Sequence, residues 1–378
     1  MNTKLGIIGG GQLGKMLIQY CNNIDLKTYI YDENEDNPCK NICYEQHIGK
    51  LNDYDELIKF GKKCNIITYE TEHININALK ELEKQKIKVY PPSYTLELIQ
   101  NKYTQKCFFI NNSLPTGNFN FFNNLQEVSY NILNNKIKLP CVWKKTTLGY
   151  DGYGVKIIKK ISDLANLEDG ECIIEDYIQI YKEISVIVAR NISGEFKHYP
   201  PLEMIFNKDS NQIEYVLGPA ELKENIIYDL IKISEKVSTY TKHIGILAIE
   251  YFITIDGKIL INELAPRPHN SGHLTIETCC PTSQFEQHIR AILNLSLGET
   301  YFTEKAIMIN LVGEEKQQNH NRVIYDNIEY VFNSKNTFLH IYGKKTSKVN
   351  RKMGHITIVG NDNLMERAIN LKKLVKIS

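Results

Sequence analysis

The strongest constraint on the fold is an alternation of short apolar strands with helical segments near the start of the chain. Strand patterns cover 4–8, 28–31 and 66–69, and helical patterns cover 12–21, 54–64 and 76–85. Strands that alternate with helices predict an open, mostly parallel α/β sheet. Pro91-Pro92-Ser93 then punctuates the chain, so we expect this first unit to end near residue 95.

A glycine-rich turn, Gly9-x-Gly11-x-x-Gly14, follows the first strand and opens the first helix, and Asp32 closes the next strand. The pattern is close to the dinucleotide-binding fingerprint, in which glycines admit a pyrophosphate to a helix N-terminus. Two alternatives stay open: a tight turn that needs glycine for close packing, and a turn that holds the phosphate or ribose of another ligand. The turn alone does not decide between them.

The rest of the chain has a different pattern, with paired strands typical of an α+β unit. Expected strands are 141–145, 155–159, 172–175, 184–190, 248–253, 258–262, 306–311, 338–342 and 356–359, and expected helices are 226–243 and 364–374. We therefore expect a central unit over residues 96–300, with a subdomain at about 115–180, and a small β-rich unit over 301–378.

Two of these strands carry glutamates among apolar residues. Glu250 lies in one and Glu263 follows the other, and Asp256-Gly257 between them is typical of a two-residue hairpin turn. The hairpin brings the carboxylates together, and burying two acids is costly unless a cation neutralises them. A salt-bridged pair is one solution. We favour Mg²⁺, which is held by oxygen ligands shared with phosphates.

A dense polar run follows directly after Glu263. Pro266 and Pro268 hold an extended segment that displays Arg267, His269 and Asn270, which suits a small planar anion bound by a guanidinium fork beside an imidazole. Upstream, a loop with three glycines between 149 and 154 can cover phosphate oxygens with backbone N–H groups. Lys144 lies on the strand that leads into this loop and can place its ammonium group on the same phosphates. A plain hairpin is the alternative for that loop.

Composition excludes several classes of protein. The formal net charge is +1, which gives no basic field for nucleic acid or an anionic membrane. No apolar run approaches the ~20 residues of a membrane span, and the first residues do not resemble a signal peptide. The nine cysteines include no Cys-x-x-Cys pair, which argues against a zinc site or a secreted disulfide scaffold. We therefore expect a cytoplasmic protein.

Taken together, these segments resemble the ATP-grasp superfamily and, within it, 5-(carboxyamino)imidazole ribonucleotide synthase. The resemblance covers nearly the whole chain. It is carried by the segments Gly9–Met16, Tyr69–His73, Gln100–Lys102, Gly149–Gly152, Glu183–Arg190, Asn262–His273, Thr282–His288, Tyr342–Lys344 and Arg351–His355. It implies an ATP-grasp fold with an N-terminal Rossmann-like domain and a small β-rich C-terminal domain.

The resemblance also implies a reaction: ATP and bicarbonate carboxylate 5-aminoimidazole ribonucleotide through carboxyphosphate, giving ADP and phosphate, in purine biosynthesis. It implies ATP and Mg²⁺ (Mn²⁺ as an alternative), small-molecule substrates only, and a homodimer. Catalytic residues would be Arg267, His269 and Asn270, and metal ligands Glu250 and Glu263. The implied ATP-binding residues are Lys102, Lys144, Gly149, Tyr150, Asp151, Gly152, Tyr153, Gly154, Val155, Glu175, Asp176, Tyr177, Ile178, Glu183, Phe206, Asn262 and Glu263. The implied ribonucleotide-binding residues are Gln12, Glu72, Tyr150, Asp151, Arg267, Lys344, Lys348 and Arg351.

The chain departs from the family pattern in two places. Thr147 and Leu148 stand where the family has a basic residue and a glycine, and Phe206 stands where a histidine is expected near the nucleotide. We expect an active enzyme with slower turnover. Competing hypotheses are another carboxylating or formylating ATP-grasp enzyme, an NAD(P)-dependent oxidoreductase built on the glycine turn, and a non-catalytic nucleotide sensor. The last would be expected to lose Glu250, Glu263 or Arg267, and all three are present.

Overall fold

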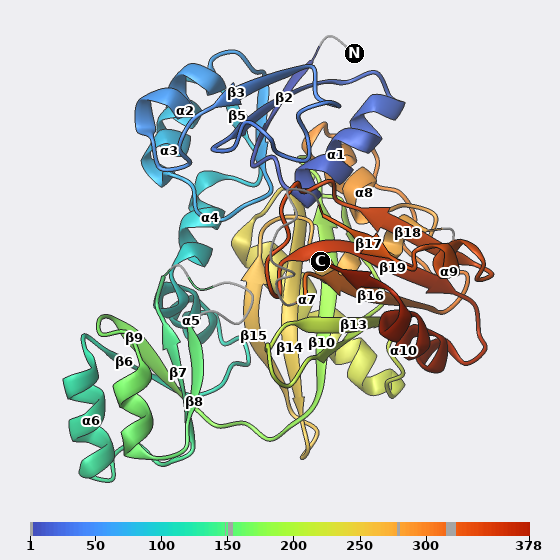
Figure 1. The fold of residues 1–378 in the computed structure, drawn as a ribbon. Helices are drawn as coiled ribbons and strands as arrows, with labels where there is room; N and C mark the ends of the chain where they lie inside the picture. Colours follow the sequence, from blue (N-terminus) through green and yellow to red (C-terminus); the bar gives the residue numbers. More distant parts are fainter. Residues whose placement is uncertain (1–2, 148, 150–153, 278–279, 315–322) are drawn as a thin grey trace.

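The computed structural model describes residues 3–147, 149, 154–277, 280–314 and 323–378. Figure 1 shows the N-terminal unit at one end of the molecule, a long twisted sheet through the centre, and a small antiparallel unit beside it. Within the described residues, no helix combines the length and apolar character needed to cross a membrane.

The N-terminal unit is a parallel sheet with the order β3-β2-β1-β4-β5. Its strands are β1 (Lys4–Ile8), β2 (Lys27–Asp32), β3 (Glu45–Ile48), β4 (Ile66–Tyr69) and β5 (Lys88–Val89), and its helices are α1 (Gln12–Asn23), α2 (Tyr54–Gly61) and α3 (Ile76–Lys84). All of its pairs are parallel, as predicted. The chain leaves β1 toward β2 on one side and reaches β4 on the other. The carboxyl ends of β1 and β4 therefore flank the crevice where such sheets bind ligands.

A small antiparallel sheet with the order β6-β9-β7-β8 follows two connecting helices. Its strands are β6 (Phe119–Phe122), β7 (Cys141–Lys145), β8 (Val155–Ile158) and β9 (Cys172–Asp176), and the accompanying helices are α4 (Ser93–Gln100), α5 (Lys102–Asn111), α6 (Leu125–Leu133) and the 3-10 helix η1 (Ile161–Asn166). A separate apolar core that includes Trp143, Val128 and Ile174 fills the space between this sheet and α6.

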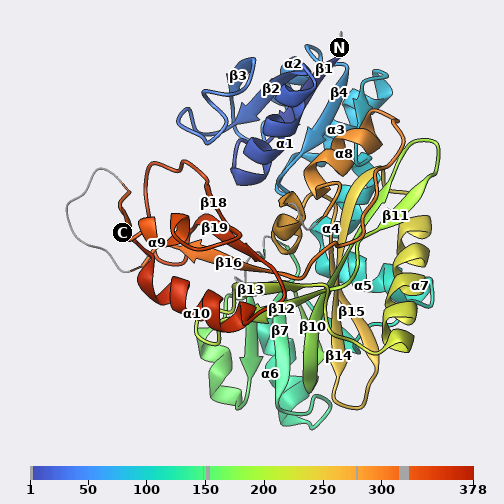
Figure 2. The same cartoon turned by 90° about the vertical axis from the view of Figure 1, so that its right-hand side faces the viewer.

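The central sheet is antiparallel and runs in the order β15-β14-β10-β12-β13-β16-β19-β18, with β11 also paired to β10. Its strands are β10 (Ile180–Arg190), β11 (Phe196–His198), β12 (Leu202–Phe206), β13 (Ile213–Gly218), β14 (Gly245–Thr254), β15 (Ile259–Ala265), β16 (Ala306–Val312), β18 (Thr337–Ile341) and β19 (Lys352–Val359). The remaining elements are α7 (Glu224–Thr241), the 3-10 helix η2 (Asn270–Ile276), α8 (Gln284–Ile292), β17 (Tyr325–Asp326), α9 (Glu329–Phe332), α10 (Leu364–Leu374) and β20 (Lys376–Ile377). Figure 2 shows α7 on one side of this sheet and α8 between the sheet and the N-terminal unit.

The predicted mixture of an α/β unit with α+β units is confirmed. The hairpin between β14 and β15 is also confirmed, but its loop differs from the prediction. The Thr254 N–H donates to the Lys258 carbonyl at 2.9 Å, which leaves Ile255, Asp256 and Gly257 in the loop. Gly257 has a φ of +83°, which fits a three-residue loop closed by a left-handed glycine.

Candidate active site

The two glutamates predicted to meet are direct partners across β14 and β15. Glu250 pairs with Glu263, and the register shifts by one residue immediately afterwards, so that Tyr251 faces Ile261. The shift leaves Asn262 as an extra residue on β15. Its amide Nδ2 lies 3.4 Å from Glu250 Oε2, and its Oδ1 accepts a hydrogen bond from Lys144 Nζ at 3.0 Å. The bulge therefore brings a third polar side chain to the carboxylate pair.

The two carboxylates have opposite electrostatic surroundings. Burial, together with the charges of Glu263 and Glu183, raises the pKa of Glu250 to about 8. Burial acts in the same direction on Glu263, but the ion pair with Lys102 outweighs it and lowers the pKa of Glu263 to about 2. Within the described residues, the ion pair of Glu250 is with His269, whose Nε2 lies 3.4 Å from Glu250 Oε1, and the charge of Lys102 also acts on Glu250. Glu250 therefore lacks a strong cationic partner such as the one that Lys102 provides for Glu263.

A buried ion triad lies where the small sheet approaches the central one. Glu175 on β9 forms ion pairs with Lys106 Nζ at 2.9 Å and with Lys144 Nζ at 2.8 Å, and its side chain is 3% exposed. Burial acts to raise the pKa of Glu175, but the two ammonium groups outweigh it and lower that pKa to about 2. Burial lowers the pKa of Lys106 to about 8. The Glu175 side chain thus fixes two lysines, one of which (Lys106) the sequence interpretation missed.

The polar run after β15 folds back toward the N-terminal unit. Arg267 forms an ion pair with Glu72 at 3.0 Å, which joins the central sheet to the loop after β4. Asn270 exchanges hydrogen bonds with Asn310: its Nδ2 donates at 2.8 Å, and its Oδ1 accepts at 2.7 Å. This exchange uses the Asn270 oxygen and one of its two N–H groups.

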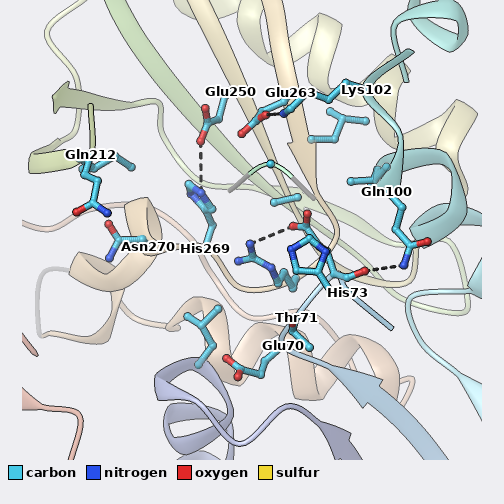
Figure 3. Close-up of a pocket in the computed structure, with 18 of the residues that line it drawn as sticks. Glu70, Thr71, His73, Gln100, Lys102, Gln212, Glu250, Glu263, His269 and Asn270 are labelled. Atoms are coloured by element: carbon cyan, nitrogen blue, oxygen red, sulfur yellow. Dashed lines mark hydrogen bonds and ion pairs between the residues drawn. The ribbon is translucent and has the colours of Figure 1, made fainter. Parts of the chain in front are cut away.

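The carboxylate pair and the polar run after β15 line a cleft of about 390 Å³. Figure 3 shows Glu250 and Glu263 side by side at one wall, His269 below Glu250, and Glu70, Thr71 and His73 on the opposite wall. Predicted residues that line the cleft are Gln12, Glu72, Lys102, Gly149, Phe206, Glu250, Glu263, Arg267, His269 and Asn270. Lining residues that the sequence interpretation missed include Glu70, Gln100, Gln105, Gln212 and Lys352. Glu70 lies inside a segment cited for the resemblance, two residues before Glu72, and this position could have identified it as a site residue.

Several other predicted residues within the described part of the chain do not line the cleft. Glu175 and Asp176 end β9, Tyr177 and Ile178 follow them, and Glu183 lies on β10. Gly154, with a φ of +77°, leads into Val155 at the start of β8. Tyr150, Asp151, Gly152 and Tyr153 lie outside the described residues, as does Leu148.

Three C-terminal residues predicted to hold the ribonucleotide do not line the cleft in the described part of the chain: Lys344, Lys348 and Arg351. Lys344 Nζ donates to the Lys352 carbonyl at 2.7 Å. Arg351 donates through Nη1 to the carbonyl and the hydroxyl of Thr346, each at 2.8 Å, and the Lys348 carbonyl accepts from the Arg351 N–H at 2.9 Å. Of this region, Lys352 is the residue that reaches the cleft wall.

The glycine turn after β1 has its N–H groups occupied. Gly10 N donates to Asp32 Oδ2 and Gly11 N donates to Glu70 Oε1, each at 2.7 Å. A Cβ at Gly11 would lie 2.5 Å from Glu70 Oε1, so glycine is needed here for the close approach of that carboxylate. A pyrophosphate would have to displace two carboxylates. The close-packing alternative therefore accounts for the turn, and the dinucleotide hypothesis loses its main support.

Comparison with known proteins agrees with this geometry. The family model of the ribonucleotide synthetase preATP-grasp domain matches residues 1–100, that of the ATP-grasp domain matches 107–285, and that of the phosphoribosylaminoimidazole carboxylase C-terminal domain matches 306–368. Fold and site together define an ATP-grasp enzyme, an ATP-dependent ligase.

Similarity to individual proteins narrows the class. N5-carboxyaminoimidazole ribonucleotide synthase of Bacillus subtilis is 36% identical over 361 residues, which cover 94% of this chain and 91% of that protein. The crystal structure of N5-carboxyaminoimidazole ribonucleotide synthetase from Thermotoga maritima is 38% identical, covers 99% of both chains and superposes with a TM-score of 0.90. The Aspergillus clavatus synthase, solved with ADP and 5-aminoimidazole ribonucleotide, is 26% identical, covers 98% of both chains and has a TM-score of 0.88. The chain belongs to the N5-carboxyaminoimidazole ribonucleotide synthase family.

Proposed function

We propose that this protein uses ATP and bicarbonate to carboxylate 5-aminoimidazole ribonucleotide, and that it releases the 5-carboxyamino product, ADP and phosphate in de novo purine synthesis. The observation that carries the proposal is the cleft itself. The carboxylates of Glu250 and Glu263 and the segment Arg267–Asn270 form one wall, and Gln12 and Glu72 of the N-terminal unit form the other. The names of the relatives and the substrates bound in the Aspergillus clavatus structure support it.

ATP would lie between the small sheet and the central sheet. The ammonium groups of Lys102 and Lys144 would meet its phosphates, covered by the loop from Gly149 to Val155. The backbone of 175–178 would meet the adenine edge, Glu183 the ribose, and Phe206 would pack against the nucleotide. Phosphoryl transfer needs positioning and positive charge more than covalent help, and buried lysines supply both.

Glu250 and Glu263, with Asn262 beside them, would hold Mg²⁺, or Mn²⁺ in its place. The fit rests on the carboxylate that lacks a strong cationic partner: Glu250 is 9% exposed and its pKa is raised. Among the described residues no group of three or more His, Cys, Asp or Glu side chains forms a metal site by itself. This suits an ion that takes its remaining oxygens from phosphates and water. The bound ion would neutralise phosphate charge.

Arg267, His269 and Asn270 would orient bicarbonate for the first step. A bicarbonate oxygen attacks the γ-phosphorus, the bond from that phosphorus to the β–γ bridging oxygen breaks, and ADP leaves, which forms carboxyphosphate. In the second step the exocyclic amine of the ribonucleotide forms a bond to the carboxyl carbon, phosphate leaves with the C–O electron pair, and the amine loses one proton. Arg267, held by Glu72, would stabilise the negative charge that grows on the carboxyl oxygens.

Gln12 and Glu72 would contact the ribonucleotide from the N-terminal unit. Lys344, Lys348 and Arg351 would meet its phosphate from the C-terminal unit, and Tyr150 and Asp151 would close over it. For the chain as a whole we propose units at 1–95, 96–300 (with a subdomain at about 115–180) and 301–378, a homodimer, and a cytoplasmic location.

Phosphate release from ATP, with Mg²⁺ and bicarbonate present, tests the proposal directly. We expect release to rise sharply when 5-aminoimidazole ribonucleotide is added. Release that ignores the ribonucleotide would mean another acceptor, and no release under saturating substrates would refute the proposal.

A further inference from the structure

The segment Thr282–His288 carries part of the family resemblance, yet no function has been assigned to it so far. It forms the start of α8, where the Ser283 hydroxyl caps the helix by accepting from the Glu286 N–H at 3.1 Å. Gln284, Gln287 and His288 on this helix are all fully buried. Buried amides and imidazoles are costly unless they are hydrogen-bonded, so their partners show what the helix holds in place.

Gln284 holds the backbone of one cleft residue with two hydrogen bonds. Its Oε1 accepts from the His269 N–H at 2.8 Å, and its Nε2 donates to the His269 carbonyl at 2.7 Å. Gly272 packs closely against the same amide, because a Cβ at Gly272 would lie 2.5 Å from Gln284 Oε1. The peptide groups on both sides of His269 Cα are therefore fixed by one side chain.

The His269 ring is held as well. Its Nδ1 accepts from the Ser271 N–H at 3.3 Å and lies 2.8 Å from Ser271 Oγ, which is hydrogen-bonded in turn to Ser185 Oγ at 2.8 Å. Nε2, the other ring nitrogen, faces Glu250. With the backbone and Nδ1 both fixed, Nε2 has one position in the cleft.

We propose that Gln284 is a positioning residue for the bicarbonate step. It acts through His269, whose Nε2 it holds at the carboxylate wall, where the ring can contact an oxygen of bicarbonate or of carboxyphosphate. The inference rests on the proposed function and deepens it. Without the amide of Gln284, the imidazole keeps its chemistry but loses its fixed place beside Arg267.

The same helix supplies a matched control. Gln287 makes an equivalent pair of hydrogen bonds, with Oε1 accepting from the Gly298 N–H at 2.7 Å and Nε2 donating to the Gly298 carbonyl at 2.8 Å. Gly298 is not a cleft residue. Gln284 and Gln287 thus share burial, helix and a pair of backbone hydrogen bonds. They differ in the peptide that they hold and in one weak contact of Gln284 Nε2 with His273 Nδ1 at 3.4 Å.

The experiment compares Gln284→Met with Gln287→Met by phosphate release at varied bicarbonate, ATP and ribonucleotide concentrations. We expect both to lower the thermal unfolding temperature by similar amounts. Only Gln284→Met should lower kcat/KM for bicarbonate, by about 10- to 100-fold, since small misplacements of a catalytic group have effects of this size. The KM for ATP should stay within about twofold of wild type, because Gln284 holds no ATP-binding residue. Gln284→Glu keeps the oxygen acceptor, and its kcat/KM for bicarbonate should lie between those of wild type and Gln284→Met.

The outcomes distinguish a failure of the role proposed for Gln284 from a failure of the proposed function. Equal losses of bicarbonate kcat/KM in the two methionine variants, or a wild-type value in Gln284→Met, would overturn the role of Gln284 and leave the proposed function standing. If Gln284→Met does not fold, a Gln284→Glu variant with unchanged bicarbonate kcat/KM would overturn it equally. A wild-type protein that ignores the ribonucleotide would overturn both proposals.

Discussion

Glu183 makes the nucleotide-free protein less stable as the pH rises, and replacing it with glutamine should reverse that effect. It lies on β10 between Met204 of β12 and Phe252 of β14. Burial raises its pKa to about 7 from an ordinary value of 4.5, against the weaker opposing charge of Lys144. A folded-state pKa above the unfolded one means that the folded protein binds more protons between these pH values. The contribution of Glu183 to stability is therefore greatest below pH 4.5 and falls until pH 7.

The size of the effect follows from the shift. A rise from 4.5 to about 7 corresponds to a loss of about 3 kcal/mol at pH 8, at 1.36 kcal/mol per pKa unit. Glu183→Gln stays neutral, so the variant should exceed wild type by about that amount at pH 8 and by little near pH 4.5. Because Glu183 is the proposed ribose contact, the KM for ATP should rise in the same variant.

Urea unfolding of the nucleotide-free protein at several values from pH 5 to pH 8 measures the difference. Glu203→Gln is the control, because Glu203 lies on the neighbouring strand β12 and is paired with Lys182 Nζ at 2.5 Å. That variant should gain no stability at pH 8. A Glu183→Gln variant that gains equally at pH 5 and pH 8, or that loses stability at pH 8, would refute the reasoning.

Three further predictions concern the cleft. Arg267→Lys keeps the charge but loses the fork held by Glu72, and should lower kcat/KM for bicarbonate by about 5- to 150-fold (about 1–3 kcal/mol); an unchanged value in steady-state assays would refute its role. Gly11→Ala places a Cβ 2.5 Å from Glu70 Oε1 and should lower the free energy of unfolding by about 1–3 kcal/mol in urea titrations, whereas an unaltered midpoint would show that Glu70 moves freely. Removal of divalent cations with EDTA should stop phosphate release and added Mg²⁺ or Mn²⁺ should restore it, with Glu250→Gln needing a higher concentration of either ion; an EDTA-resistant activity would contradict the metal site.

The elements predicted well were those whose apolar residues carry the pattern by themselves. β1 and β4 have the predicted bounds, because their residues form short continuous apolar runs. β3 was missed, since Glu-Gln-His-Ile is polar and none of its residues is fully buried. α8 was also missed, because its buried face is built partly from glutamine and histidine, which resemble surface residues in a sequence.

The contacts of the site also include some that a local sequence pattern predicts and some that it does not. The meeting of Glu250 and Glu263 was predictable from the hairpin signal between two apolar strands. Their direct pairing also depends on the bulge at Asn262, which offsets the extra loop residue. The exchange of hydrogen bonds between Asn270 and Asn310 joins residues 40 positions apart, and the ion triad of Glu175 joins three separate elements. No local pattern encodes such contacts. They follow from packing that only the folded chain defines.

The order of the central sheet bears on whether the C-terminal unit is a separable module. β16 adds directly to β13 by antiparallel pairing, and β19 and β18 continue the same sheet. A chain cut after residue 300 would leave the N–H and carbonyl groups along one side of β13 without partners, and such an open edge invites pairing between molecules. Amide hydrogen exchange should therefore find β13 and β16 protected to the same degree, as parts of one cooperative structure. Although three family models divide this sequence, the last segment cannot be exchanged between proteins like an independent domain.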